Sequence, residues 1–292
     1  MRLPPSTRPN CLRASLLEST RAAPTVASLA AESRLPALEC GVLLAHVLRV
    51  DRARLASCPE AEVTPALAAA ARSLFARRLR GEPVAYLVGE REFFGLTYRV
   101  TPDVLIPRPE TELLVELALD RMPRERRMRL LDLGTGSGAI AVTLALERPC
   151  AEIDACDASA AALAVAAGNA ARHGVRVRLV LSDWFTALRG SQYDLIVSNP
   201  PYVCAQDPHL SGDLRYEPAL ALNGGGDGLA GIRVIASQAS GFLSAGGWLL
   251  LEHGYDQGET CVQMLREAGY EDIADYPDLA GIARLCAGRR AV

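Results

Sequence analysis

The chain has 292 residues, which is enough for two domains or for one large domain with an appendage. Half of its residues are hydrophobic and 22% are charged, a globular balance that excludes long disordered segments. Its formal net charge of -3 provides no overall positive field for holding polyanions, and no run approaches the length of a membrane span.

The cysteines and the N-terminus bear on the compartment. The eight cysteines form no C-x-x-C pair, so we expect neither a zinc site nor any other metal site, and no disulfide framework. Residues 1–20 lack the apolar core of a signal peptide. We therefore expect a soluble, cytoplasmic protein that is not exported and has no membrane partner.

Residues 1–81 are predicted to form a small helical domain. From Leu12 to about Arg80 the sequence is rich in Ala, Leu and Arg, and apolar residues recur at helical spacing. Four prolines punctuate this segment, at Pro24, Pro36, Pro59 and Pro65. Because prolines end helices, we expect several short helices packed as a bundle. No catalytic pattern is visible there, so a scaffold or docking domain is the main interpretation.

Residues 82–107 are predicted to be a linker built on a β-hairpin. Aromatic and β-branched residues with intervening glycines are concentrated in residues 84–100. The Pro-x-Pro loop that follows leaves two interpretations for Arg108 and Glu110, a solvated turn or a rigid loop that places both beside a ligand. Residues 112–118 then have the pattern of an amphipathic helix.

A strand, a glycine-rich turn and a helix follow one another over residues 129–147, and the turn is Gly134-Thr135-Gly136-Ser137-Gly138. Glycines let the backbone approach a ligand closely, and the first amides of the helix are free to bind it. The spacing also satisfies the dinucleotide-binding pattern. Asp132 argues against a dinucleotide, because its carboxylate would repel a pyrophosphate. It suits a ligand with a cationic amino acid group, such as S-adenosylmethionine.

The next two predicted strands end in side chains suited to a nucleoside. Asp157 ends the strand at residues 151–157, about twenty residues after the glycine turn, where a carboxylate can accept hydrogen bonds from both ribose hydroxyls. The strand at residues 177–181 leads to Asp183 and Trp184, an acid and an aromatic ring that could bracket an adenine. A core position for Trp184 is the equal alternative.

The apolar run at residues 193–197 predicts a buried strand, which two consecutive prolines end. Directly after it come Asn199, Pro200, Pro201 and Tyr202. The Asn199 side-chain carbonyl and the Pro200 backbone carbonyl can accept two N–H bonds, and the Tyr202 ring offers a face for stacking. These residues suit the holding of a planar NH2 group. An ordinary Asn-Pro turn is the alternative.

The rest of the chain continues the alternation of strands and helices. Residues 216–229 are rich in glycine and predict a loop able to cover a site. Helices are expected at residues 232–243 and 257–268, and strands at residues 247–252, 271–276 and 282–287. This alternation predicts a mostly parallel sheet with helices on both faces.

The motifs in this order resemble the class I S-adenosylmethionine-dependent methyltransferases. With residues 106–112, 216–218 and 251–254 added, the chain is similar to the HemK/PrmC family, most strongly from about Arg91 onward. The resemblance implies an α/β fold, with a Rossmann-like, mostly parallel seven-stranded sheet in residues 108–292 behind a small N-terminal helical bundle. Where the family usually has an Asp-Ala-Glu-like triplet, this chain has Glu39-Cys40-Gly41, so docking by that helix is not carried over.

The resemblance also implies an activity. That family transfers a methyl group from S-adenosyl-L-methionine to the glutamine side-chain amide in the Gly-Gly-Gln motif of peptide chain release factors, which modulates translation termination. The resemblance assigns cofactor binding to Gly134, Thr135, Gly136, Ser137, Gly138, Asp157, Trp184 and Asn199. It assigns substrate binding to Asn199, Pro200, Pro201 and Tyr202, with Asn199, Pro200 and Tyr202 as catalytic residues. No metal and no direct nucleic-acid contact is expected.

Two other functions are compatible with parts of this pattern. An amino-methyltransferase acting on adenine N6 or cytosine N4 would hold the same planar NH2 group. The negative net charge and the lack of a basic, aromatic-rich segment argue against it. A non-enzymatic docking protein with a degenerate Rossmann domain is disfavoured by the intact cofactor and amide-binding residues.

Overall fold

The computed structural model describes residues 23–292, without the side chains of His209, Ser211 and Asp213. The expectations for residues 1–20, and for the start of the helical segment at Leu12, lie outside the described residues. The chain divides into two compact units, Met1–Phe75 and Ala76–Val292. The division falls inside a helix, whereas the sequence placed the domain boundary after residue 81. The domain bounds 1–81, 82–107 and 108–292 stay a prediction.

The described part of the first unit is helical. Its helices are α1 (Val26–Glu32), α2 (Ala37–Leu48), α3 (Arg52–Ser57) and most of α4 (Pro65–Leu79). Thr25 caps α1 by accepting from the Ser28 backbone N–H at 3.2 Å, and Asp51 caps α3 by accepting from that of Arg54 at 2.6 Å. The apolar faces meet in a core of Leu29, Leu43, Leu44, Ala68, Ala71 and Phe75.

A short helix precedes the hairpin, which corrects the hairpin predicted from residue 84 onward. The elements are α5 (Val84–Val88), β1 (Glu90–Phe93) and β2 (Leu96–Arg99). Pro83 begins the helix, and Gly89, at φ 78°, ends it in the left-handed conformation. Phe94 and Gly95 both have positive φ, as the tight turn between twisted antiparallel strands requires.

The second unit contains the predicted seven-stranded sheet. Its strands are β3 (Arg129–Leu133), β4 (Glu152–Asp157), β5 (Arg178–Leu181), β6 (Tyr193–Ser198), β7 (Leu243–Glu252), β8 (Tyr270–Pro277) and β9 (Ala283–Arg290). They lie in the order β5-β4-β3-β6-β7-β9-β8, and only the pairings of β9 are antiparallel. The chain moves outward from β3 through β5 and then returns to place β6 on the other side of β3. The loops after β3 and β6 therefore diverge, and a crevice opens at the sheet's carboxyl edge.

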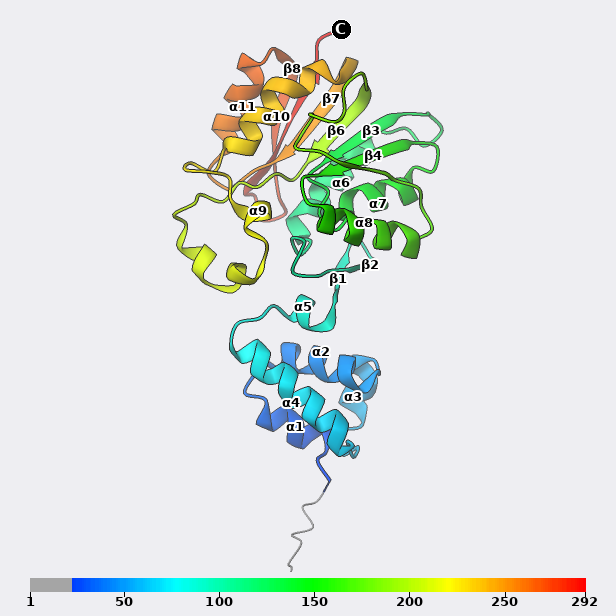
Figure 1. Cartoon of the computed structure of the whole chain (residues 1–292), viewed down its shortest axis with the longest axis vertical. Coiled ribbons are helices and arrows are strands. Elements are labelled where there is room, and N and C mark those ends of the chain that lie inside the picture. Colours follow the sequence, from blue (N-terminus) through cyan, green and yellow to red (C-terminus); the bar gives the residue numbers. More distant parts are fainter. Residues whose placement is uncertain (1–22) are drawn as a thin grey trace, which may run out of the picture. The chain divides into compact units, whose positions relative to one another are not determined.

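Helices cover both faces of this sheet (Figure 1). One face carries α6 (Glu112–Asp120), α7 (Ala139–Glu147) and α8 (Ala160–Arg172), and the other carries α10 (Ala230–Gln238) and α11 (Gly258–Glu267). Successive residues of a strand point to opposite faces of the sheet. Leu130 and Leu131 of β3 therefore pack in two different hydrophobic cores. The double covering explains why the strands are apolar on both sides.

Short elements complete the second unit. They are η1 (Pro109–Thr111), η2 (Pro208–Ser211), η3 (Asp213–Tyr216), α9 (Ala219–Leu222) and η4 (Ala239–Gly241). The helix predicted to reach residue 243 ends earlier, because Leu243 already pairs with Tyr193 as the first residue of β7. Within residues 23–292 we find no helix long and apolar enough to cross a membrane.

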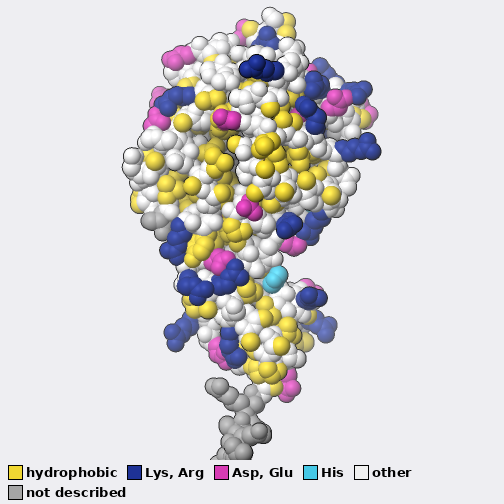
Figure 2. Space-filling view, viewed as in Figure 1, with side chains coloured by type: hydrophobic (Ala, Val, Ile, Leu, Met, Phe, Trp, Pro, Cys, Tyr) yellow, Lys and Arg dark blue, Asp and Glu magenta, His cyan; other side chains and the backbone are white. Residues whose placement is uncertain are grey.

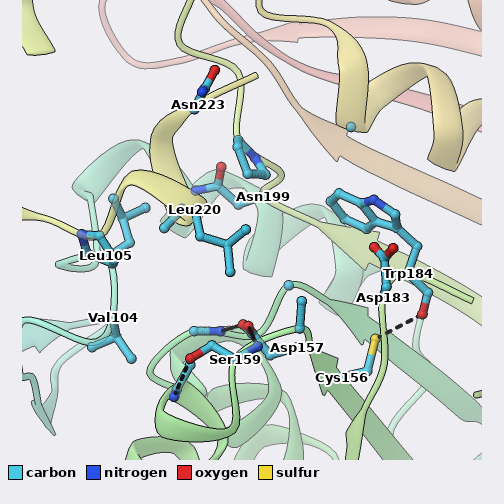
Figure 3. A pocket seen from close by; sticks show the side chains of 18 of the residues that line it. Val104, Leu105, Cys156, Asp157, Ser159, Asp183, Trp184, Asn199, Leu220 and Asn223 are labelled. Carbon is cyan, nitrogen blue, oxygen red and sulfur yellow. Dashed lines mark hydrogen bonds between the residues drawn. The ribbon is translucent and has the colours of Figure 1, made fainter. Parts of the chain in front are cut away.

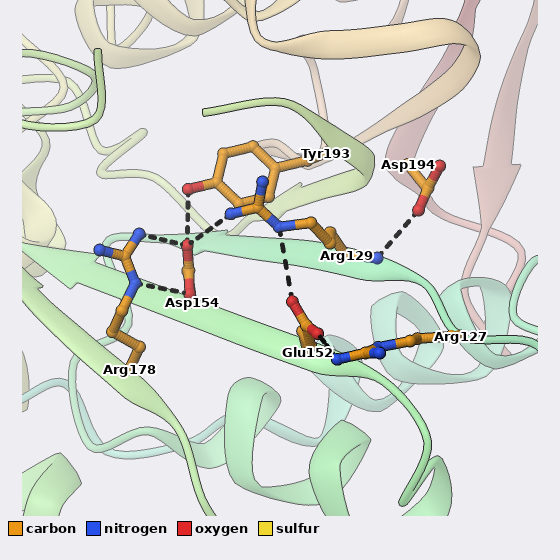
Figure 4. A network of polar contacts seen from close by, with 7 residues as sticks. All are labelled: Arg127, Arg129, Glu152, Asp154, Arg178, Tyr193 and Asp194. Carbon is orange, nitrogen blue, oxygen red and sulfur yellow. Dashed lines mark hydrogen bonds and ion pairs between the residues drawn. The ribbon is translucent and has the colours of Figure 1, made fainter. Parts of the chain in front are cut away.

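A polar network lies at the beginning of the central strands, away from the carboxyl edge (Figure 4). Buried Asp154 accepts from Arg178 Nε at 2.9 Å and from the Tyr193 hydroxyl at 2.8 Å, and Arg129 lies 3.6 Å from it. Burial alone would raise the pKa of Asp154, but the hydrogen bonds from Arg178 and Tyr193 outweigh burial and lower it. The network ties β4 to β5 and β6.

Candidate cofactor and substrate site

A cavity of about 450 Å³ opens at the carboxyl edge of the sheet. Its walls come from the ends of β3, β4 and β6, from the segment after β5, and from residues 102–105 and 218–223 (Figure 3). Figure 2 shows hydrophobic side chains on both sides of a hollow in the visible face of this unit. A cavity with apolar walls and a few convergent polar groups is typical of a small-molecule site.

The glycine turn after β3 contributes Gly134 and Gly136 to the cavity wall. Both have positive φ, which lets the backbone pass close under a ligand. Gly138 is not among the wall residues, and a Cβ there would lie 3.1 Å from Ala166 Cβ, so this glycine lets the turn pack closely against α8. Thr135 and Ser137 are buried and are not among the wall residues. Of the five predicted turn residues, two line the cavity and three shape the turn behind them.

Asp132 lies behind the same turn. Its side chain is fully buried, its Oδ2 accepts from the Thr135 hydroxyl at 2.7 Å, and its Oδ1 has no hydrogen-bond partner among the described residues. Burial raises the pKa of Asp132 to about 7. Asp132 therefore holds the turn from below and is not part of the cavity wall.

Asp157 lies in the cavity wall at the end of β4, with its carboxylate fixed in place. Its Oδ2 accepts from the Gly136 backbone N–H at 2.9 Å, and its Oδ1 accepts from that of Ser159 at 2.9 Å. Each oxygen keeps a further lone pair for a ligand hydroxyl. Ser159 also caps α8 by accepting from the Ala162 N–H at 3.2 Å. The carboxylate is thus held in position before a ligand binds.

Trp184 lies both in the cavity wall and against the core under α10, and its contact with an adenine stays a prediction. Its backbone has φ 47°, which is unfavourable for a bulky residue. A Cβ on Gly231 of α10 would lie 3.1 Å from the Trp184 ring, so this glycine makes room for the indole. No motif in the sequence indicates Gly231 as part of the site.

Asn199 enters the cavity wall from the end of β6, in a defined orientation. Its Nδ2 donates to the Thr111 hydroxyl at 3.0 Å, which leaves Oδ1 as an acceptor for a ligand. Pro201 also lines the cavity, whereas Pro200 and Tyr202 lie beside it. The Tyr202 hydroxyl donates to Glu252 Oε1 at 3.1 Å, and burial raises the pKa of Tyr202 far above its usual value.

Arg108 and Glu110 have different surroundings, and the two interpretations of this loop stay predictions. Arg108 forms an ion pair with Glu217, whereas Glu110 is exposed. Thr111 and Glu252 are further residues at the site that no sequence motif indicated. Both lie in the segments 106–112 and 251–254 that contribute to the family resemblance. The positions of these segments in the sequence do not indicate that they meet the end of β6.

Comparisons with known proteins agree with this geometry. Residues 110–227 match the family described as methyltransferase small domain, and residues 25–89 match the PrmC N-terminal domain. A release factor glutamine methyltransferase of Bordetella pertussis is 54% identical over 89% of this chain and 97% of its own length. The release factor glutamine methyltransferase of Coxiella burnetii is 46% identical over 88% of this chain and 93% of its own length.

Solved structures bear on the fold. A methyltransferase from Pyrococcus furiosus has a TM-score of 0.52 and 18% identity, covering 74% of this chain and 98% of that one. A 16S rRNA methyltransferase from T. thermophilus, in complex with AdoMet and guanosine, also has a TM-score of 0.52, with 20% identity over 69% of this chain and 49% of its own. These likenesses show the methyltransferase fold.

Proposed function

The chain belongs to the release factor glutamine methyltransferases, and we propose that the cavity at the carboxyl edge of its sheet binds S-adenosylmethionine next to a glutamine of the Gly-Gly-Gln motif. The enzyme methylates a release factor glutamine with S-adenosylmethionine as methyl donor. We further propose which residues hold the cofactor and which hold the glutamine amide. The observation that carries these assignments is the bond from Asn199 Nδ2 to Thr111, which leaves Asn199 Oδ1 to accept from an amide.

The cavity residues fit the cofactor. Asp157 has lone pairs free for the two ribose hydroxyls, and Trp184 offers an aromatic face for the adenine. Gly134 and Gly136 bring backbone close to the methionine portion, and Thr135, Ser137 and Gly138 support that turn. Bound there, S-adenosylmethionine supplies an electrophilic methyl group on a sulfonium.

The amide is proposed to lie between Asn199, Pro200, Pro201 and Tyr202, here named the amide clamp. An amide nitrogen is a poor nucleophile because its lone pair is delocalised into the carbonyl. Asn199 Oδ1 and the Pro200 backbone carbonyl accept its two N–H bonds, which aims the lone pair at the methyl carbon and stabilises the growing positive charge. Such positioning can supply roughly 7–11 kcal/mol of a barrier.

No strong base is needed before transfer. The cofactor would supply the methyl group, with the electron pair of its S–C bond left on sulfur as the amide nitrogen takes the methyl carbon. The N-methylated amide is then positively charged and very acidic, so it loses its proton to water. The amide clamp only has to orient the group and stabilise its charge, which neutral acceptors can do.

We propose that the N-terminal helical unit supplies a second contact to the release factor. A glutamine side chain offers too few atoms for selection at the roughly −0.3 to −1.5 kcal/mol per atom that ligands achieve. A remote contact raises the effective concentration without touching the reacting atom. The match of residues 25–89 to the PrmC N-terminal domain supports a family-specific role.

The enzyme is proposed to work in the cytoplasm, in keeping with the free state of the cysteines in residues 23–292.

The test is a product assay with labelled S-adenosylmethionine and a purified release factor, read by peptide mass spectrometry. We expect a methyl group on the Gly-Gly-Gln glutamine, and a higher KM for an isolated peptide of that loop than for the whole factor. Asn199→Ala should lower kcat about 100- to 1000-fold, the cost of losing one preorganised polar group, with little change in melting temperature. Label in nucleic acid alone would support the adenine or cytosine alternative.

A further inference from the structure

Asn169 of α8 is a buried polar side chain between the β1–β2 hairpin and the glycine turn after β3. It is 0% exposed. Its Oδ1 accepts from the Arg99 backbone N–H at 2.8 Å, and its Nδ2 donates to the Arg99 carbonyl at 3.0 Å and to the Ser137 carbonyl at 2.8 Å. One side chain therefore joins strand β2 of the hairpin to the turn that contributes to the cavity wall.

The three backbone partners fix the orientation of the Asn169 amide. A backbone N–H can only donate and a backbone carbonyl can only accept, so the side-chain oxygen faces the Arg99 N–H and the NH2 group faces the two carbonyls. Both hydrogens of Nδ2 are then in use. An aspartate of the same shape could accept from Arg99 but could not donate to either carbonyl. The site therefore needs an amide.

A second buried residue of β2 reaches the helix that follows the glycine turn. Tyr98 is 0% exposed, and its hydroxyl lies 2.7 Å from the Thr143 hydroxyl of α7. Thr143 donates its own hydrogen to the Ala139 carbonyl at 2.7 Å, so the Tyr98 hydroxyl is the donor of the pair. The hairpin thus contacts α7 through Tyr98 and the glycine turn itself through Asn169.

The glycine turn is held by one contact on each side of its middle. The Gly136 N–H donates to Asp157 Oδ2 at 2.9 Å, within the cavity wall. The Ser137 carbonyl accepts from Asn169, which comes from behind the turn. Gly134 and Gly136 have positive φ, a conformation that a glycine leaves easily because no Cβ restricts it. Two fixed peptide groups therefore hold a segment whose own residues would allow several shapes.

We propose that Asn169 is a positioning residue for the cofactor, and that through it the β1–β2 hairpin supports the cofactor site without lining the cavity. The inference rests on the proposed role of the glycine turn in holding the methionine portion of S-adenosylmethionine. Asn169 itself touches neither cofactor nor substrate. Loss of its bonds frees the Ser137 peptide group, so that the turn must be ordered again each time the cofactor binds.

Asn169→Asp tests this role with almost no change of shape. The variant still accepts from the Arg99 N–H, but it turns an acceptor toward the Arg99 and Ser137 carbonyls. We expect the dissociation constant for S-adenosylmethionine, measured by titration calorimetry, to rise at least about tenfold, as for buried polar groups left unpaired. At saturating cofactor, kcat should fall less than about threefold, because the amide clamp is untouched.

Asn169→Ala gives a milder, second measurement. It leaves space in which water can bind the three backbone groups, so the dissociation constant should rise only about fivefold. Hydrogen–deuterium exchange gives a separate readout of the turn. In Asn169→Ala the backbone amides of residues 134–139 should exchange faster than in the wild type, whereas those of strands β6 and β7 should not.

Tyr98→Phe is the matched control, because it removes a buried hydrogen bond of the same hairpin that does not reach the glycine turn. It should lower the melting temperature and leave the dissociation constant for S-adenosylmethionine within about twofold of the wild type. The proposal is overturned if both Asn169 variants bind the cofactor within about twofold of the wild type. It is also overturned if Tyr98→Phe loses as much affinity as they do for the same fall in melting temperature.

Gly136→Ala separates this inference from the proposed function. Gly136 lines the cavity at φ 54°, and an added methyl group there would strain the turn and take up space at its surface. If Gly136→Ala loses cofactor affinity and the Asn169 variants do not, only the role of Asn169 is wrong. If Gly136→Ala also binds as the wild type does, or if the wild type binds no S-adenosylmethionine, the proposed cofactor site itself is refuted.

Discussion

Arg108 and Glu217 form an ion pair that joins two segments of the cavity wall. The Glu217 side chain is 3% exposed, and its other oxygen accepts from the Ile106 backbone N–H at 3.0 Å. Val104 lies just before this contact and Pro218 just after it, and both line the cavity. Glu217 therefore holds the loop before η1 against the segment that leads into α9.

Glu217→Ala should loosen this wall. The change leaves the Ile106 N–H and the half-buried Arg108 without their acceptor, which should lower the free energy of unfolding by about 1–3 kcal/mol. Affinity for S-adenosylmethionine should fall with it, as measured by calorimetry. Arg233→Ala is the control, because its pair with Asp227 is half exposed and should matter little. Equal effects of the two variants would contradict the role given to Glu217.

Asp157→Ala should weaken cofactor binding. The carboxylate is proposed to accept from both ribose hydroxyls, and losing such charged hydrogen bonds costs about 1.5–3 kcal/mol of binding free energy. Asp157→Asn keeps the shape and one acceptor, so its loss should be smaller. Titration calorimetry with S-adenosylmethionine measures both. An unchanged dissociation constant in Asp157→Ala would remove this residue from the ribose site.

Much of the site could be predicted because the chemistry lies at strand ends. Buried parallel strands are largely apolar runs that end where glycine, proline or polar residues begin, and the ends of β3 to β6 meet at one sheet edge. Gly134, Gly136, Asp157, Trp184 and Asn199 accordingly line one cavity. The seven-stranded fold and the family are confirmed by the strand order and by the relatives.

Other features depend on contacts that no local pattern encodes. Thr111 and Glu252 come from η1 and β7, and the packing of these elements beside the end of β6 brings Thr111 to Asn199 and Glu252 to Tyr202. The helix α5 was missed for another reason. Its residues favour strands, but Pro83 and Gly89 punctuate it as a helix, and this signal outweighed propensity.

The network at Asp154 predicts a particular pH dependence of stability. The pKa of this carboxyl is lowered in the folded state, so its contribution is fully present above the unfolded value of about 3.9 and is lost as pH falls through the folded value. Asp154→Asn removes the contribution. The difference in free energy of unfolding between wild type and variant should be largest at neutral pH and shrink below about pH 4. Denaturant titrations at several pH values measure it, and a difference that grows on acidification would contradict the assignment.

Gly228 should be needed to keep the amide clamp in place. It has φ 77°, and a Cβ there would collide with the Tyr202 backbone oxygen and lie 2.6 Å from Gln257 Nε2. Gln257 Nε2 donates to that same oxygen at 3.1 Å and its Oε1 accepts from the Gly254 N–H, so the added methyl group would push apart the bond that fixes the backbone of Tyr202.

Gly228→Ala should therefore lower the free energy of unfolding by about 1–3 kcal/mol, from backbone strain and the collision, and lower kcat more than cofactor affinity. Gly226→Ala is the matched control in the same loop, because Gly226 has no positive φ and a Cβ there would meet nothing within 4 Å. Thermal melts and steady-state assays of the two variants side by side decide the matter. If Gly228→Ala turns over like Gly226→Ala, the backbone of Tyr202 does not need this support, and the amide clamp must be held by the bonds of Asn199 to Thr111 and of Tyr202 to Glu252 alone.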